Sequence, residues 1–127
     1  MILIVDDNPD AAHLLNVLLT RLTYPCQMAY GGSEALEKIR AHPTSEPLFV
    51  ILDDMMPELD GLEVLRTLRA DPAFADLPVV MYSARLHAER RDEAIKLGAK
   101  DWILKGQDVN ATLNAFTEFY RQACNNR

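Results

Sequence analysis

Short, mainly apolar runs alternate with segments of helical periodicity five times along this chain of 127 residues. The apolar runs are residues 2–5, 26–30, 48–52, 79–82 and 101–104. The helical segments, in which apolar side chains recur every three or four positions, are 10–22, 33–41, 61–70, 87–97 and 108–123. Such short apolar runs are typical of strands that are buried on both faces. The alternation therefore predicts an α/β fold of five βα units, with a parallel sheet between two layers of helices.

Residues with known preferences for helix ends support these boundaries. Asn8 and Pro9 suit the cap and the first turn of the first helix. Asp60 is placed to cap the third helix, and Gly98 is placed to end the fourth.

The composition is that of an ordinary globular domain. Hydrophobic content of 49% with 25% charged residues excludes a disordered chain, a collagen-like fibre and a coiled coil. The net charge of −6 argues against binding to nucleic acid or to an anionic membrane, since both require a basic face. Cys26 and Cys124 have no metal-binding spacing and are predicted to be free thiols in a reducing compartment. No segment predicts a signal peptide or a membrane span, so we expect a cytoplasmic domain.

Polar side chains directly follow four of the predicted strands. In chain order they are Asp6 and Asp7, Asp53 and Asp54, Ser83, and Lys105. Ligands of doubly wound α/β domains bind at the carboxyl ends of the strands, where the strand order reverses. Because these ends lie along one edge of a parallel sheet, we expect the carboxylates, the hydroxyl and the ammonium group to gather there.

This set of groups is suited to one kind of chemistry. Carboxylates held close together stay ionised only if a cation shares the site, and a few hard oxygen ligands with room for water suit Mg²⁺. Phosphoryl transfer requires a nucleophile, a divalent ion, a fixed cation, and hydroxyl or amide donors. An aspartate can itself be the nucleophile and form an acyl phosphate. The strand ends therefore predict Mg²⁺-dependent phosphoryl transfer.

Four segments resemble the receiver domains of bacterial two-component response regulators, and the resemblance extends over essentially the whole chain. They are Ile-Val-Asp-Asp-Asn-Pro at 4–9, Ile-Leu-Asp-Asp-Met-Met-Pro-Glu-Leu-Asp-Gly at 51–61, Met-Tyr-Ser-Ala at 81–84 and Gly-Ala-Lys-Asp-Trp-Ile-Leu-Lys at 98–105. The resemblance implies that residues 1–127 form one receiver domain with the flavodoxin-like strand order 2-1-3-4-5. The family's phosphoacceptor precedes the proline of the second segment by four positions, which selects Asp53 rather than Asp54.

The resemblance also implies a magnesium site. Asp6 and Asp7 would hold Mg²⁺, one of them directly and the other through water. Asp53 and the backbone carbonyl of Met55 would be further ligands.

Phosphoryl binding and switching are implied in the same way. Ser83 would bond one phosphoryl oxygen, and Lys105 would pair with another. Trp102 stands where the family keeps a Tyr or Phe that changes rotamer on activation, together with Ser83. The fourth helix, the fifth strand and the fifth helix would then form an output surface for a partner protein or for a homodimer.

Two positions depart from the family pattern. Gly106 follows Lys105, where the family usually has a proline after a cis peptide. A cis bond before glycine costs about 2.5–4 kcal/mol, so we expect a trans peptide here. The indole of Trp102 is larger than a phenol ring, and we expect its bulk to hinder the inward rotamer.

Several other polar residues are expected to have only structural roles. Asp54 is interpreted as a solvated or turn-forming carboxylate and not as a metal ligand. His13, His42 and His87 have no metal-binding spacing and are interpreted as surface or helix residues.

The predicted function is a phosphorylation-switched signalling domain. A sensor histidine kinase or a histidine phosphotransfer protein would supply the phosphoryl group to Asp53. Self-catalysed uptake and loss of this group would be the only reaction of the domain, so we do not expect an enzyme. A phosphate-independent receiver-like interaction module is the alternative, motivated by Gly106 and Trp102. An aspartate-nucleophile phosphatase would need a second aspartate two positions after the first, where this chain has Met55. The sequence leaves open whether the chain acts alone or within a longer protein.

Overall fold

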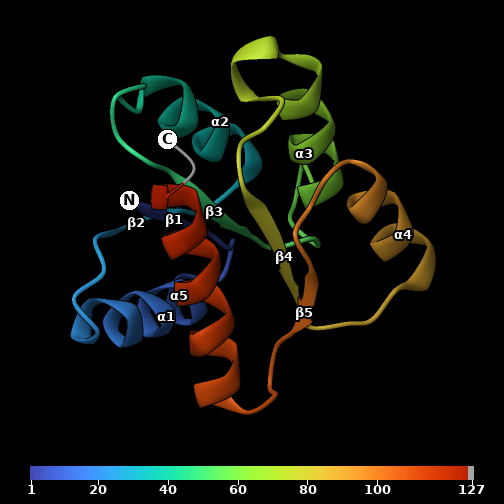
Figure 1. The fold of residues 1–127 in the computed structure, drawn as a ribbon. Helices are drawn as coiled ribbons and strands as arrows, with labels where there is room; N and C mark the ends of the chain where they lie inside the picture. The colour runs from blue at the N-terminus through green and yellow to red at the C-terminus, as the bar shows by residue number, and fades with distance from the viewer. Residues whose placement is uncertain (126–127) are drawn as a thin grey trace.

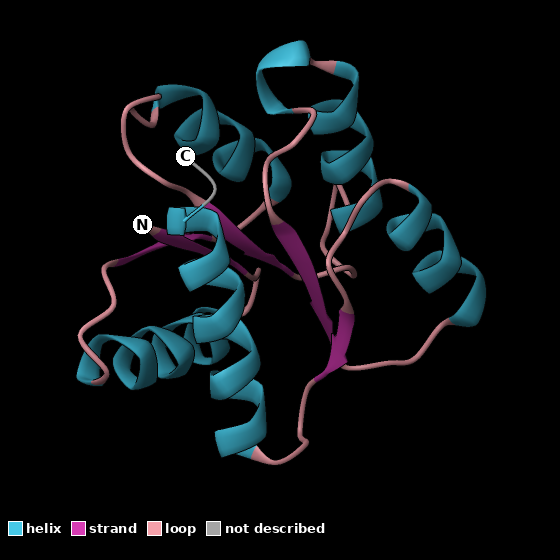
Figure 2. Cartoon of the chain, in the orientation of Figure 1, coloured by secondary structure: helices cyan, strands magenta, loops and turns pink. Residues whose placement is uncertain are grey.

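The computed structural model describes residues 1–125, in which five parallel strands form one sheet between two layers of helices (Figure 1, Figure 2). The strands are β1 (Ile2–Val5), β2 (Cys26–Ala29), β3 (Phe49–Leu52), β4 (Val79–Ser83) and β5 (Trp102–Leu104). The helices are α1 (Pro9–Arg21), α2 (Gly32–Ala41), α3 (Gly61–Ala70), α4 (Ala88–Lys96) and α5 (Val109–Asn125), with a short 3-10 helix η1 (Pro72–Phe74). Neighbouring strands follow the order β2-β1-β3-β4-β5. The predicted fold class and strand order are confirmed.

The central strands β1 and β3 are buried along their whole length, which is why every one of their positions is apolar. They pair in parallel, with Ile2 opposite Phe49 and Val5 opposite Leu52. The residues that follow the two strands therefore emerge side by side. The strand order reverses here, because the chain passes from β1 to β2 on one side and then crosses to β3 on the other. This switch point is where α/β domains place their ligands.

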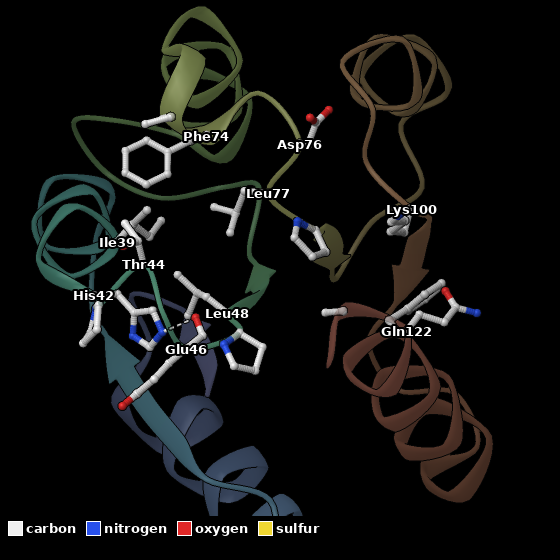
Figure 3. Close-up of a pocket in the computed structure, with 16 residues that line it drawn as sticks. Ile39, His42, Thr44, Glu46, Leu48, Phe74, Asp76, Leu77, Lys100 and Gln122 are labelled. Carbon is white, nitrogen blue, oxygen red and sulfur yellow. Dashed lines mark hydrogen bonds between the residues drawn. The ribbon is translucent and has the colours of Figure 1, made fainter. Parts of the chain in front are cut away.

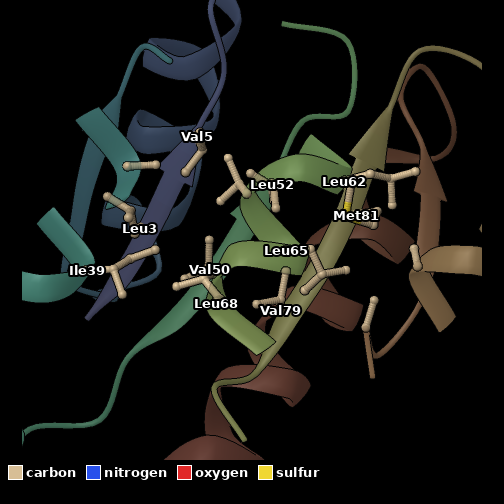
Figure 4. Packing of buried hydrophobic residues seen from close by; sticks show 14 of the residues in the cluster. Leu3, Val5, Ile39, Val50, Leu52, Leu62, Leu65, Leu68, Val79 and Met81 are labelled. Carbon is tan, nitrogen blue, oxygen red and sulfur yellow. The ribbon is translucent and has the colours of Figure 1, made fainter. Parts of the chain in front are cut away.

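Alternate side chains of the strands enter two separate hydrophobic cores. In β1, Leu3 and Val5 belong to the core covered by α2, α3 and α4, whereas Ile2 and Ile4 belong to the core covered by α1 and α5. Figure 4 shows the first core, in which Leu65 of α3 packs over the strands. The two cores pack against opposite faces of the sheet and so position the side chains at its carboxyl edge.

Hydrogen bonds at the helix ends confirm two of the predicted caps. The side chain of Asn8 accepts hydrogen bonds from the backbone N–H groups of Asp10 and Ala11, at 3.0 and 3.3 Å. Asp60 and Glu63 each accept the other's backbone N–H, which forms a capping box at the start of α3.

Element boundaries differ from the prediction by one or a few residues. Ser83 extends β4, because it pairs with Leu104 of β5. Tyr30 lies outside β2 and is exposed. Gly98 has a φ of 84°, a left-handed conformation that ends the helical region after α4 as predicted.

Two further expectations concern the environment of the protein. Within residues 1–125, no helix is both long and apolar enough to cross a membrane. Cys26 and Cys124 are half-buried free thiols, as predicted.

Gly61 lies at the close approach between the start of α3 and the end of β3. A Cβ atom at this position would clash with the carbonyl oxygen of Asp53 and would lie 2.9 Å from the Cα of Asp54. Because both are backbone atoms, Gly61→Ala forces the helix or the strand end to shift. We expect the free energy of unfolding to fall by about 2 kcal/mol or more, measured by chemical denaturation. Gly31→Ala is the control, since a Cβ there meets nothing within 4 Å. Equal denaturation midpoints for the two variants would contradict the prediction.

Candidate functional site

Three carboxylates meet at the carboxyl ends of β1 and β3. Asp6 and Asp7 follow β1, Asp53 follows β3, and each offers one oxygen within 4.8 Å of the other two. Asp6 and Asp53 are buried, whereas Asp7 is exposed and leaves one side of the cluster open to water. Hard oxygen donors with room for water fit Mg²⁺. The structure thus brings together the three acidic side chains that the sequence placed at one edge.

Lys105 reaches this cluster from the end of β5. Its Nζ donates a hydrogen bond to Asp6 Oδ2 at 2.6 Å and lies 3.6 Å from Asp53 Oδ2. Burial lowers the pKa of the Lys105 ammonium, but the hydrogen bond to Asp6 and the negative charges of Asp53 and Asp6 outweigh burial, so that its pKa is raised. Lys105 therefore remains charged and offsets part of the repulsion among the carboxylates.

Asp53 is the carboxylate whose ionisation the site disfavours. Its side chain is buried, with 7% of the residue's surface exposed. Burial, aided by the charges of Asp6 and Asp7 and opposed by Lys105, raises the pKa of Asp53 from 3.8 to about 7. In the absence of a cation, the folded protein thus binds a proton at Asp53 over a pH range in which the unfolded chain does not.

Removing this carboxylate charge should stabilise the metal-free protein. We expect Asp53→Asn to raise the free energy of unfolding at about pH 8 by about 1 kcal/mol or more. The wild-type stability due to this group should fall as the pH rises from 3.8 to about 7, because the folded state binds the proton more tightly than the unfolded state. Asp53→Asn should lack this decline.

Denaturation curves in EDTA at several pH values measure the effect. Mg²⁺ should then stabilise the wild type more than Asp53→Asn, because only the wild type presents the third carboxylate. An Asp53→Asn protein that is less stable than the wild type in EDTA at about pH 8 would contradict the assigned repulsion.

Ser83 and Gly106 shape the neighbouring strand ends. The backbone carbonyl of Ser83 accepts the N–H of Lys105 at 2.8 Å, and its buried Oγ accepts the N–H of Arg85 at 3.3 Å. The Lys105–Gly106 peptide is trans, as predicted, since residues 1–125 contain no cis peptide. Gly106 has a φ of 83°, which a proline ring cannot adopt. The loop before α5 therefore follows a path that a proline at position 106 would prevent.

The expectation that bulk hinders the inward rotamer of Trp102 is wrong. The indole is buried, with only 6% of the residue's surface exposed, and it belongs to the core that also contains Ala94 and Ala99. Its Nε1–H donates a hydrogen bond to the carbonyl of Arg85 at 3.1 Å. The indole is therefore accommodated in this core, and the loop after β4 supplies an acceptor for its N–H. Trp102 thereby joins β5 to that loop.

Asp54 is also not the solvated carboxylate that the sequence suggested. It is 1% exposed and accepts two hydrogen bonds from Arg90, from Nε at 2.7 Å and from Nη2 at 2.6 Å. Nη2 of Arg90 also lies 3.3 Å from Asp60 Oδ2. The hydrogen bond to Asp54 raises the pKa of Arg90, so the arginine is charged at any physiological pH. Asp54 faces α4 in an ion pair, whereas Asp53 faces the acidic cluster.

Sequence reasoning did not single out Arg90. The only signal was a second aspartate beside the expected phosphoacceptor together with an arginine in the first turn of a charged helix. Met55 follows Asp54 in the loop after β3, and 65% of the residue's surface is exposed.

A hollow of about 300 Å³ lies at the opposite edge of the sheet (Figure 3). Its lining includes Leu48 before β3 and Pro78 before β4, which are at the amino ends of the strands. Lys100, at the amino end of β5, also lines it. This hollow is therefore separate from the acidic cluster.

The fold and the site together define an α/β domain with a cluster of three carboxylates, one of them hydrogen-bonded to a lysine, at the point where the strand order reverses. Residues 2–117 match the family model of the response regulator receiver domain. The chain belongs to this family, whose members are the phosphoacceptor domains of two-component signalling.

Individual proteins that resemble this chain support the family assignment. Response regulator GtcR of Aneurinibacillus migulanus is 38% identical over 104 residues, which are 82% of this chain and 40% of that protein. The alkaline phosphatase synthesis transcriptional regulatory protein PhoP of Bacillus subtilis is 35% identical over 117 residues, 90% of this chain and 47% of that protein. The chain thus spans less than half the length of these relatives. The N-terminal domain of a response regulator receiver protein from Methanoculleus marisnigri superposes with a TM-score of 0.74 at 36% identity, covering 92% of this chain and 93% of that one.

Proposed function

We propose that this domain takes up a phosphoryl group on Asp53, with Mg²⁺ held by Asp6, Asp7, Asp53 and the backbone carbonyl of Met55. The observation that carries the proposal is the meeting of three carboxylates within 4.8 Å, with Lys105 hydrogen-bonded to one of them. When bound, Mg²⁺ supplies positive charge that neutralises phosphoryl oxygens. Residues 1–127 form the receiver domain in this proposal.

The residues of the chain have complementary roles in the transfer. An ionised oxygen of Asp53 attacks the phosphorus of a phosphohistidine, and a P–O bond forms while the P–N bond breaks. The imidazole nitrogen leaves with the electron pair of the broken bond. Lys105 and the Ser83 hydroxyl would hold phosphoryl oxygens, since both lie at the ends of neighbouring strands. The domain positions the reacting groups and takes the product on its own side chain, which is why it is not classed as an enzyme.

The phosphodonor in this proposal is a sensor histidine kinase or a histidine phosphotransfer protein. Large apolar side chains are exposed around the carboxyl edge of the sheet; they are Leu14, Met55, Leu86 and Val109. A groove of about 290 Å³ between α1 and α5 adds apolar lining and contains Lys105. An apolar rim around a charged centre suits a partner that must exclude water while its phosphohistidine reaches Asp53.

The output in this proposal is a change at α4, β5 and α5, read by a partner protein or by a second copy of the chain. The added negative charge would draw Ser83 toward the phosphoryl group, and the loop after β4 would move with it. Trp102 is hydrogen-bonded to that loop, which supports its role as part of the switch. A cytoplasmic location fits these partners and the free thiols.

A phosphate-independent interaction module is the second candidate. The observation that favours it is the glycine after Lys105, whose φ of 83° gives this loop a conformation that a proline cannot adopt.

One experiment separates the two candidates. The wild-type protein is incubated with acetyl phosphate and Mg²⁺, and its intact mass is measured with and without EDTA. The gain of one phosphoryl group, abolished by EDTA, supports the receiver function. Absence of any adduct, with Trp102 fluorescence also insensitive to Mg²⁺, supports the phosphate-independent module.

A further inference from the structure

The ion pair between Asp54 and Arg90 joins the loop after β3 to the first turn of α4, 36 positions further along the chain. Arg90 binds the carboxylate through two nitrogens, and the same guanidinium lies 3.3 Å from Asp60, the cap of α3. Two parallel N–H···O bonds fix the orientation of both partners as well as their separation. Asp54 is 1% exposed with Arg90 in place, so withdrawal of the arginine would cost this carboxylate two charge-assisted hydrogen bonds.

We propose that Arg90 is a positioning residue for the phosphoacceptor site, which couples the geometry of that site to the position of α4. The proposal rests on the phosphoryl uptake proposed above. It adds the ion pair between Arg90 and Asp54 as the contact through which the phosphoacceptor site and α4 act on one another. The pair is a feature of the side chains of this particular sequence, in which the residue after the phosphoacceptor is an aspartate.

Asp54 is placed to set the geometry of the site because of its backbone. Its N–H interacts with the Asp53 carboxylate and opposes the rise of that group's pKa, and its carbonyl accepts the N–H of Gly61 at 2.8 Å. The next residue is Met55, whose carbonyl is the expected metal ligand. Fixing the Asp54 side chain therefore fixes the backbone on both sides of it, between the phosphoacceptor and that carbonyl.

The attachment of α4 to the rest of the domain makes Arg90 important for the helix as well. Ala94 is the buried residue that α4 contributes. Polar contacts with α3 supplement it, since Glu93 pairs with Arg66, and the carbonyl of Leu97 accepts a hydrogen bond from Arg69 at 2.6 Å. These contacts hold the middle of α4 and the residue after it, whereas Arg90 holds the first turn.

These contacts imply a two-way linkage. A displacement of the first turn of α4 must either break the hydrogen bonds between Arg90 and Asp54 or move Asp54 with it. A change at Asp53 that shifts the backbone of Asp54 must likewise act on Arg90. Coupling of this kind is reciprocal, so it can be measured from either end.

The experiment compares Arg90→Lys with Arg91→Lys in the full chain. Lysine keeps the charge at position 90 but loses the two-pronged contact with Asp54. Arg91 is the exposed neighbour in the same turn of α4 and provides a matched control. The readouts are the rate of phosphoryl uptake from acetyl phosphate and the amide hydrogen exchange of residues 88–96, with and without Mg²⁺.

We expect Arg90→Lys to slow uptake about tenfold, and Arg91→Lys to leave it at the wild-type rate. Mg²⁺ alone should slow amide exchange in α4 of the wild type and of Arg91→Lys, but not of Arg90→Lys. This second readout does not depend on phosphorylation. If the wild type takes up no phosphoryl group, the proposed function fails, whereas the coupling is still judged by the Mg²⁺ effect on exchange.

Asp54→Asn provides a second variant of nearly unchanged shape. It should slow uptake and remove the Mg²⁺ effect as Arg90→Lys does, and combining the two changes should add little further loss. The proposal is overturned if Mg²⁺ slows exchange in α4 equally with and without the intact pair. It is also overturned if Arg90→Lys and Asp54→Asn both take up phosphate at the wild-type rate.

Discussion

We expect the Asp53→Asn protein to take up no phosphoryl group from acetyl phosphate, whereas the wild type should gain one. This is the largest functional effect that we expect, because the amide of asparagine is not a nucleophile toward phosphorus under these conditions. The substitution removes charge with little change in volume and is expected to stabilise the metal-free protein. Loss of uptake therefore cannot be explained by unfolding. Intact mass spectrometry in the presence of Mg²⁺ gives a direct answer.

The matched control for this experiment is Asp76→Asn. Asp76 is an exposed aspartate that lines the hollow at the opposite edge of the sheet, far from the acidic cluster (Figure 3). Its substitution should leave uptake unchanged. If Asp53→Asn still gains one phosphoryl group, the acceptor is another residue, and peptide mapping would show which of the neighbouring acids carries it.

Lys105→Met should lower the rate of phosphoryl uptake by about 10²-fold. Lys105 is hydrogen-bonded to Asp6 and lies 3.6 Å from Asp53, so its ammonium group is already placed where negative charge accumulates during transfer. Methionine keeps much of the length and volume of the side chain but removes the charge. The expected result is a slow reaction that still requires Asp53. Single-turnover uptake from acetyl phosphate measures the rate.

The control is Lys100→Met, which changes an exposed lysine near the amino end of β5 to the same residue. It has the same effect on net charge but lies at the other edge of the sheet. Its uptake should match that of the wild type. Equal uptake rates for Lys105→Met and the wild type would show that Lys105 does not bind the phosphoryl group and serves only as the partner of Asp6.

Much of the architecture follows from local sequence properties. The apolar runs of β1 and β3 predict buried strands because a strand covered on both faces tolerates no polar side chain. Once the strands are parallel, Asp6, Asp7 and Asp53 must meet at one edge, and the structure brings them within 4.8 Å. The predicted helix caps at Asn8 and Asp60 are equally local, because each bonds to N–H groups within three positions.

What the sequence could not reveal depends on contacts between distant elements. Asp54 looks like a surface carboxylate until α4 is placed over it, and its partner is 36 positions away. The accommodation of Trp102 depends in the same way on the surrounding core and on the carbonyl of Arg85, 17 positions away. Residue type alone does not determine whether a charge or a large ring is buried; the surrounding elements do.

The contact between Asp6 and Lys105 joins residues 99 positions apart. On a ribosome the three acids emerge early, as β1 and β3 are made, whereas Lys105 emerges only after β5. A nascent chain that ends before β5 holds its acids without the lysine that offsets them, and it lacks the last strand of the sheet. The proposed phosphoryl uptake would therefore be efficient only in chains whose translation has passed β5 and whose sheet is complete. An unfinished copy of the protein would thus be phosphorylated poorly before its proposed output surface is complete.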